Sequence, residues 1–251
     1  MIYGTRPLQK GDRGPDVIEL QMRLAGFRGT LPDGIFGPGS ELQVVTFQKE
    51  WMGLSAPHGS VDNATFRAID DFARAFPLDF DKIKCPCGYC SGFGRGHHRG
   101  RYRGERPKIE AYHRYEYPGV HRMLLWAYRA ADFYCRRQGL SLVITSGYRC
   151  AECYRQKGRR STNHHGKALD FDILNLPDKR EEMKACGRIR GCLVTHANAQ
   201  IGWWGRNRKS LEPSEIAPTW IHYDVRSYER QYLADRFFVR DAETLDRAAA
   251  A

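Results

Sequence analysis

Apolar residues recur at helical spacing in the first third of the chain, and glycines punctuate the intervals between these stretches. Asp33–Pro38 supplies a turn and then a proline that suits the first turn of a helix. Asp62 or Asn63 can cap a later helix. The pattern predicts a small three-helix unit over residues 8 to about 76. Its apolar positions are Val17, Leu20 and Leu24, then Leu42 and Val45, and then Phe66, Ile69, Ala73 and Phe76.

A longer helix and a strand are predicted after residue 117. Pro118 suits the start of the helix, and Gly139 suits its C-terminal end. Leu140–Thr145 is typical of a buried strand, and it delivers Ser146–Arg149 at its end, where loops commonly hold site residues. The apolar stripe of the helix comprises Val120, Met123, Leu124, Ala127, Ala131 and Tyr134.

Two further segments combine β-like alternation with histidines and carboxylates. In residues 220–225, a period of two sends His222 and Asp224 to one face of a strand and the apolar residues to the other. An earlier segment places imidazoles just upstream of Asp170 and Asp172, which share one face. We therefore expect two strands whose polar side chains lie on one shared face, with apolar side chains on the opposite face.

These polar groups have the composition of a zinc site. Zinc favours nitrogen and oxygen ligands, and a catalytic site typically keeps three protein ligands and leaves the fourth position for water. His164, Asp170 and His222 fit that count. A single histidine on a half-buried strand is more often an ordinary surface residue, but the combination favours a metal.

Composition restricts the class of protein. The 251 residues are 41% hydrophobic and 27% charged, and no apolar stretch approaches the roughly 18 residues of a membrane helix. The first residues lack the basic and apolar regions of a cleaved secretory signal. A net charge of +11 favours encounter with polyanions such as nucleic acid, anionic cell wall or lipid headgroups.

Cysteines and glycines mark a connecting region over residues 79–117. Eight cysteines without a visible signal indicate thiols or metal ligands rather than a disulfide framework. Cys85–Cys90 holds three of them, a cluster typical of one part of a structural zinc site that Cys150–Cys153 has the spacing to complete. A disulfide between Cys186 and Cys192 and a plain buried thiol are the alternatives. The Arg/Gly-rich residues 92–104 suit either contact with single-stranded nucleic acid or a solvated loop.

The N-terminal unit resembles the peptidoglycan-binding domain 1 family. The resemblance rests on Lys10–Val17, Leu20–Gln21, Asp33–Pro38 and Phe47–Gln48. It implies a non-catalytic, wall-anchoring domain over residues 1–78, with a shallow groove for glycan or stem peptide. The residues of its most characteristic turn, which we take as candidate substrate contacts, are Asp33, Gly34, Phe36 and Gly37. Phe36 is more typical of a core residue than of a ligand contact, and the glycines are more typical of backbone conformations that only glycine adopts readily than of recognition.

The second half resembles the M15 family of zinc peptidases, which includes D-alanyl-D-alanine carboxypeptidases and phage endolysins. The matching segments are Ser146–Arg149, His164 with Gly166–Asp170, and Trp220–His222. The resemblance begins near residue 80 and implies a zinc peptidase domain, taken as residues 118–240, with His164, Asp170 and His222 as ligands. Arg149 is the candidate for gripping a substrate carboxylate, although an arginine at a strand end is also commonly an ion-pair partner.

Two departures from the M15 pattern leave alternatives open. One residue, rather than two, separates His164 from Gly166, so His165 with Asp172 is the alternative ligand pair. The positions that hold the general base in the family are Trp220 and Thr219 here, and neither can take a proton. Asp224 is the candidate catalytic base or an orienting carboxylate, and Glu212 and Glu215 are the other candidates.

Together these features predict an α+β fold, with a three-helix wall-binding domain beside a mainly antiparallel sheet flanked by helices. The two resemblances imply a monomeric endolysin that is made in the host bacterial cytoplasm and cuts an amide bond of peptidoglycan. The cut bond joins L-alanine to D-glutamate or follows a D-alanine. A non-catalytic wall-binding protein with a structural metal is the alternative. A basic nucleic-acid-binding protein is a third class, but we expect no stable nucleic-acid complex.

Overall fold

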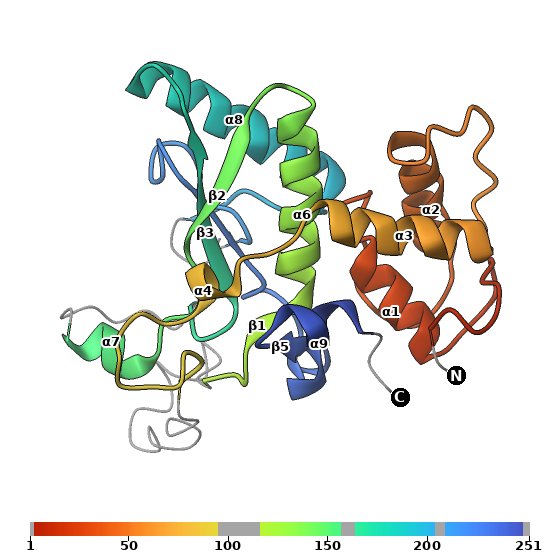
Figure 1. Cartoon of the computed structure of the whole chain (residues 1–251), viewed down its shortest axis with the longest axis horizontal. Helices are drawn as coiled ribbons and strands as arrows, with labels where there is room; N and C mark the ends of the chain where they lie inside the picture. Colours follow the sequence, from red (N-terminus) through yellow and green to blue (C-terminus); the bar gives the residue numbers. More distant parts are fainter. Residues whose placement is uncertain (1–2, 95–115, 157–163, 204–208, 248–251) are drawn as a thin grey trace.

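A long central helix, α6 (Arg122–Arg136), separates two groups of elements in the computed structural model (Figure 1). One group is helical, and the other is built round a small sheet. The structure describes residues 3–94, 116–156, 164–203 and 209–247. Helices and antiparallel strands are both present, which confirms the predicted α+β fold.

The helical group is the three-helix unit predicted from the sequence. It comprises α1 (Pro15–Arg23), α2 (Pro38–Glu50) and α3 (Asn63–Ala75). Helix α2 begins at the predicted proline, and Asp62 caps α3 by accepting a hydrogen bond from the Thr65 amide at 2.8 Å. The core of the unit is aromatic, with Phe27 in edge contact with Phe47 and Phe72.

The sheet has the order β2–β3–β4 and is antiparallel throughout. Its strands are β2 (Ser141–Ser146), β3 (Ala168–Leu174) and β4 (Ile221–Asp224). Helices α6 and α8 (Lys179–His196) pack against its apolar face, where Phe171 of β3 meets Tyr128 of α6 at 5.3 Å between ring centroids. The opposite face is therefore left for the polar side chains of β3 and β4.

The predicted start of the long helix at Pro118 is wrong. Val120 and His121 instead form strand β1, which pairs with β5 (Phe238–Val239), and α6 begins at Arg122. The approach of the two strands is so close that a Cβ on Gly119 would lie 2.0 Å from the Val239 carbonyl oxygen. The predicted C-terminal end is confirmed, because Gly139 adopts a left-handed φ of 72° just beyond the helix.

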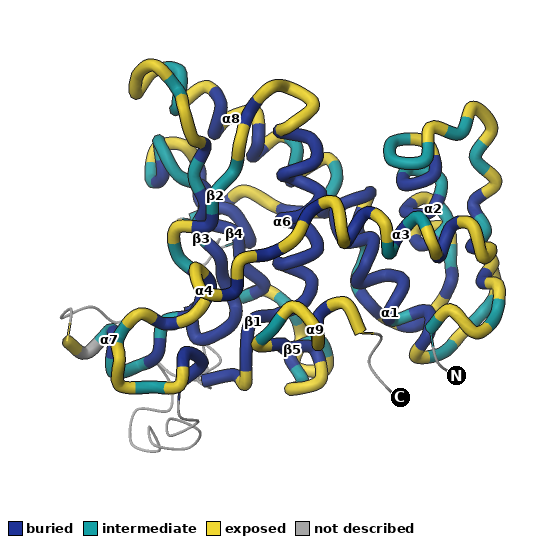
Figure 2. Tube along the Cα trace, viewed as in Figure 1, coloured by how far each residue is buried: buried dark blue, intermediate teal, exposed yellow. Residues whose placement is uncertain are grey.

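Helix α6 is buried on all sides rather than along one stripe (Figure 2). Every residue from Arg122 to Cys135 is buried, because the sheet covers one side of the helix and α1 covers another. Arg122 and Arg129 are buried with it, and both form ion pairs with carboxylates. The apolar stripe seen in the sequence marks only part of the contact surface.

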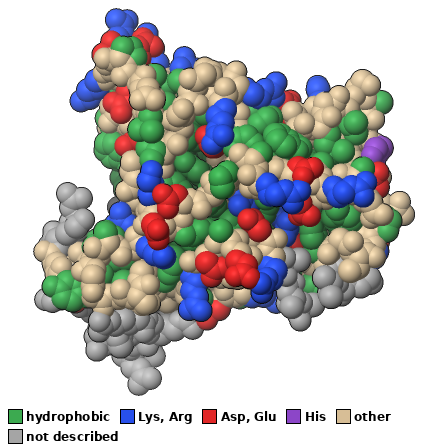
Figure 3. All heavy atoms as spheres, in the orientation of Figure 1, with side chains coloured by type: hydrophobic (Ala, Val, Ile, Leu, Met, Phe, Trp, Pro, Cys, Tyr) green, Lys and Arg blue, Asp and Glu red, His purple; other side chains and the backbone are tan. Residues whose placement is uncertain are grey.

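Short elements complete the described chain. They are α4 (Phe80–Ile83), α7 (Ala151–Gln156), the 3-10 helices η2 (Arg230–Leu233) and η3 (Asp235–Phe237), and α9 (Ala242–Asp246). Most of the Arg/Gly-rich segment, from residue 95 onward, lies outside the described residues. Within the part that is described, no helix has both the length and the apolar character needed to cross a membrane. On the face in Figure 3, basic side chains lie among acidic ones.

The alternative of a disulfide between Cys186 and Cys192 is wrong, since neither cysteine is part of a disulfide. Both residues lie in α8, six positions apart. A helix rises about 9 Å over six residues, whereas the Cα atoms of a disulfide lie within about 7 Å of one another. Cys135 of α6 is a plain buried thiol, which was the other alternative for the cysteines.

Candidate metal centre

A row of polar side chains crosses the face of the sheet opposite to α6 and α8. Asp170 of β3 lies directly opposite His222 of β4, and Ser146 of β2 lies opposite Asp170 on the other side. Directly opposed residues of antiparallel strands point to the same face, so the predicted convergence of Asp170 and His222 follows from the register.

His164 joins this row from the loop before β3. Its Nε2 lies 3.2 Å from one carboxylate oxygen of Asp170, and His222 Nδ1 lies 2.6 Å from the other. One ligand atom from each of the three residues lies within 4.8 Å of the other two. The alternative pair, His165 and Asp172, is not part of this cluster.

The His164 imidazole is oriented by a backbone carbonyl. Its Nδ1 lies 2.8 Å from the Gly147 carbonyl oxygen, to which it donates, and this leaves Nε2 facing Asp170. Ligating histidines in metal sites typically donate their other ring N–H in this way. Gly147 is required at this point, because a Cβ on it would lie 2.4 Å from the Ile83 carbonyl oxygen.

The His222 imidazole is oriented by a carboxylate. Its Nε2 lies 3.0 Å from Asp224, which is fully buried and also forms an ion pair with Arg226. The Arg226 amide donates to the second Asp224 oxygen at 2.9 Å. Asp224 thus has its acceptor sites engaged, which favours the orienting role over that of a proton acceptor. The Trp203 ring lies 6.1 Å from the His222 ring.

The pKa values of the cluster reflect mutual stabilisation. Burial alone would raise the pKa of Asp170, but the neighbouring His164 and His222 outweigh it and lower that pKa. Burial opposes protonation of His222, but its hydrogen bonds to Asp170 and Asp224 raise its pKa to about 10. Two imidazoles, each held by a second partner, and one carboxylate form a donor set that suits Zn²⁺.

Glu212 is a further carboxylate near this row, after Asp170 and Asp224. Leu211 forms a bridge with Tyr223, and the Glu212 amide donates to the His222 carbonyl oxygen at 3.4 Å, so Glu212 lies across from His222. Burial raises the pKa of its carboxyl, and the charge of Asp170 acts in the same direction. Glu215, the other candidate, is exposed.

Arg149 is joined to His164 through the backbone, since the Arg149 amide donates to the His164 carbonyl oxygen at 2.8 Å. Its guanidinium group is directed at backbone carbonyls, the nearest being that of Tyr148 at 2.7 Å. Substrate contact by Arg149 stays a prediction. Sequence reasoning did not identify the Gly147 carbonyl as the anchor of His164, because a backbone contact leaves no mark in the residue types. It also missed Arg226, whose ion pair with Asp224, two positions earlier, is seen only in the structure.

The turn of the helical unit is held together by Gln21. Its amide nitrogen donates to Asp33 at 2.7 Å, and its oxygen accepts from the Gly34 amide at 2.9 Å. Phe36 is buried at 1% exposure, as the core alternative expects, and Gly37 caps α2. Any ligand contact of these four turn residues stays a prediction.

A comparison with protein families agrees with the N-terminal resemblance. The matched region contains most of the three helices and the Asp33–Pro38 turn. Residues 13–69 match the family model described as "Putative peptidoglycan binding domain", and the chain therefore contains a peptidoglycan-binding module.

Proposed function

We propose that this protein is a zinc-dependent peptidoglycan hydrolase of the endolysin type. The observation that supports this most strongly is the convergence of His164, Asp170 and His222 in a chain that also contains a peptidoglycan-binding module. The substrate is the stem or cross-link peptide of the bacterial wall, cut between L-alanine and D-glutamate or at a D-alanine bond. The enzyme is a monomer, made in the host cytoplasm and acting on the wall.

Three side chains hold the metal in this proposal: His164 through Nε2, His222 through Nδ1, and Asp170 through its carboxylate. A zinc ion bound there supplies a Lewis acid for the scissile carbonyl and lowers the pKa of a bound water. Asp224 and the Gly147 carbonyl fix the two imidazoles, so that little reorganisation accompanies binding.

Glu212 accepts the proton of the attacking water in this scheme. Its buried position and raised pKa match a group that must both take up a proton and return it to the leaving amine. Arg149 orients the peptide through a substrate carboxylate, for which its planar guanidinium group has the geometry. The N-terminal module keeps the enzyme on its insoluble substrate.

Digestion of purified peptidoglycan, with and without a chelator, tests this function. Mass analysis of the fragments should show new amino termini from the zinc-loaded protein, and none after chelation or in His222→Ala. The variant should still sediment with peptidoglycan, because the module does not include His222. Sedimentation without any release of amino groups by the zinc-loaded wild type would instead support a non-catalytic wall-binding protein.

A further inference from the structure

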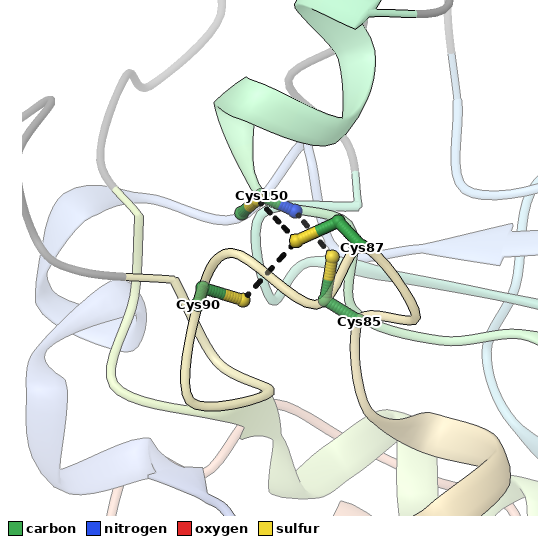
Figure 4. A group of neighbouring side chains, drawn as sticks. All are labelled: Cys85, Cys87, Cys90 and Cys150. Atoms are coloured by element: carbon green, nitrogen blue, oxygen red, sulfur yellow. Dashed lines mark hydrogen bonds between the residues drawn. The ribbon is translucent and has the colours of Figure 1, made fainter.

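Four cysteines meet at a second site, which shares no residue with the polar row of the sheet. Cys85, Cys87 and Cys90 follow helix α4, and Cys150 immediately precedes α7 (Figure 4). Their sulfur atoms all lie within 4.8 Å of one another. Cys153, which the sequence also offered for such a site, is not in this group.

The sulfur spacings suit a shared metal ion better than disulfides. Cys87 Sγ lies 3.7 Å from Cys90 Sγ and 3.5 Å from Cys150 Sγ. Sulfurs bonded to one tetrahedral zinc at about 2.3 Å lie roughly 3.8 Å apart, whereas a disulfide joins its sulfurs at about 2.05 Å.

The backbone round the cluster is arranged to stabilise thiolates. Each of the four sulfurs accepts a backbone N–H, and hydrogen bonds to the charged form favour that form. Gly88 and Gly92, with φ values of 69° and 100°, make the tight turns that aim these amides. The donors, in the order of the acceptors Cys85, Cys87, Cys90 and Cys150, are the amides of Cys150, Tyr89, Gly92 and Cys153, at 3.3–3.4 Å.

We propose that Cys85, Cys87, Cys90 and Cys150 bind a structural Zn²⁺ ion, separate from the metal of the proposed hydrolytic site. Four thiolates fill a tetrahedral coordination sphere and leave no position for water, which is the arrangement of structural rather than catalytic zinc. The four thiols release their protons to solvent as the ion binds.

This zinc fastens the connecting region to the loop that supports the polar row. The Tyr148 amide already donates to the Ile83 carbonyl oxygen at 2.6 Å, and the Cys85 amide donates to that of Gly92 at 2.8 Å. Gly147, three residues before Cys150, supplies the carbonyl that orients His164. The ion is therefore a positioning group for the His164 side of the cluster, and its loss should weaken metal retention there.

Metal content of the full-length protein tests the proposal. After dialysis of zinc-loaded samples, mass spectrometry should find about two zinc ions per wild-type chain and at most about one in Cys87→Ser or Cys150→Ser. His222→Ala should keep about one. Cys192→Ser is the matched control, since Cys192 lies in α8 outside the cluster, and it should keep the wild-type content.

Cobalt substitution distinguishes the two sites independently of activity. Thiolate-to-cobalt charge-transfer absorption should appear in the wild type, persist in His222→Ala and disappear in Cys87→Ser. X-ray absorption of the zinc-loaded wild type should give zinc–sulfur bonds near about 2.3 Å, a result that does not depend on a cysteine variant folding.

Several outcomes would overturn the proposal. Iron rather than zinc after growth in metal-replete medium, disulfides among these four cysteines, or an X-ray absorption spectrum with no sulfur ligand would each end it. If His222→Ala and the wild type hold the same amount of zinc while the cysteine variants hold less, the cysteine site stands and the hydrolytic site fails.

Discussion

The two imidazoles of the candidate metal centre are hydrogen-bonded to acceptors of different charge. His164 donates to a neutral backbone carbonyl, whereas His222 meets the buried carboxylate of Asp224. A carboxylate partner makes an imidazole more basic than a carbonyl does, so His222 is the stronger donor to a metal. Asp224 in turn forms an ion pair with Arg226, which holds the carboxylate in place.

At the same scale, Glu212→Gln should lower kcat for peptidoglycan hydrolysis by about 10²–10⁴-fold, since a glutamine cannot accept the proton. Zinc content should stay at the wild-type level, because Glu212 is not in the metal-binding cluster. Release of amino groups and metal analysis on the same sample measure both. Glu215→Gln, three residues away and exposed, is the control and should keep full activity. Equal rates for the two variants would remove Glu212 from the mechanism.

Elements that follow from local periodicity were predictable from the sequence, and elements that depend on distant pairing were not. The three helices of the module, the position of strand β2 and the polar face of β3 and β4 each follow from spacing within one segment. The predicted burial of β2 is wrong, since only Ile144 of this strand is buried. The pairing of β1 with β5 joins positions more than a hundred residues apart and replaces the first turn of the predicted helix. The convergence of Asp170 and His222 was predictable because a period of two places them on one face, whereas His164 reaches the cluster from a loop and Glu212 depends on a bridge outside the regular strands.

The junction of β1 and α6 depends on a neutral imidazole. His121 is fully buried, accepts a hydrogen bond from the Met123 amide at Nδ1 and donates from Nε2 to the Tyr232 carbonyl oxygen at 2.8 Å. A proton on Nδ1 would abolish the first of these bonds. Burial lowers the pKa of His121 to about 4, with the nearby Arg122 charge acting in the same direction.

The free energy of unfolding should therefore fall as the pH drops from 6.5 to about 4. Between pH 6.5 and about 4, an unfolded His121 binds a proton that the folded one excludes, so unfolding becomes easier as the pH drops. The contribution of His121 to this decline should be about 3 kcal/mol across that interval. Urea denaturation at several pH values should show a shallower decline in His121→Gln. The same slope in both proteins would contradict the assignment, and His58→Gln, at an exposed site, serves as the control.

On the scale of the whole molecule, charged side chains join the peptidoglycan-binding module to the rest of the chain. Glu19 of α1 accepts two hydrogen bonds of 2.6 Å from Arg122 of α6, and one of 2.8 Å from Arg23. Arg122 also donates to the Leu245 carbonyl oxygen in α9, and Arg129 pairs with Asp246 there. The module, the central helix and the C-terminal helix thus share one buried network, which continues the shared apolar core.

Removing the charge of Glu19 should therefore destabilise the whole protein rather than the module alone. Glu19 is 2% exposed, and its loss leaves Arg23 and Arg122 buried without their shared partner, which costs about 3–5 kcal/mol. Glu19→Gln should lower the midpoint of a single urea transition, followed by both tryptophan fluorescence and circular dichroism. Glu41→Gln, which breaks only the exposed pair with Lys10, should change stability by less than about 1 kcal/mol. Separate transitions for the two probes, or equal effects of the two variants, would show that the module folds independently and that the network does not couple it to α6.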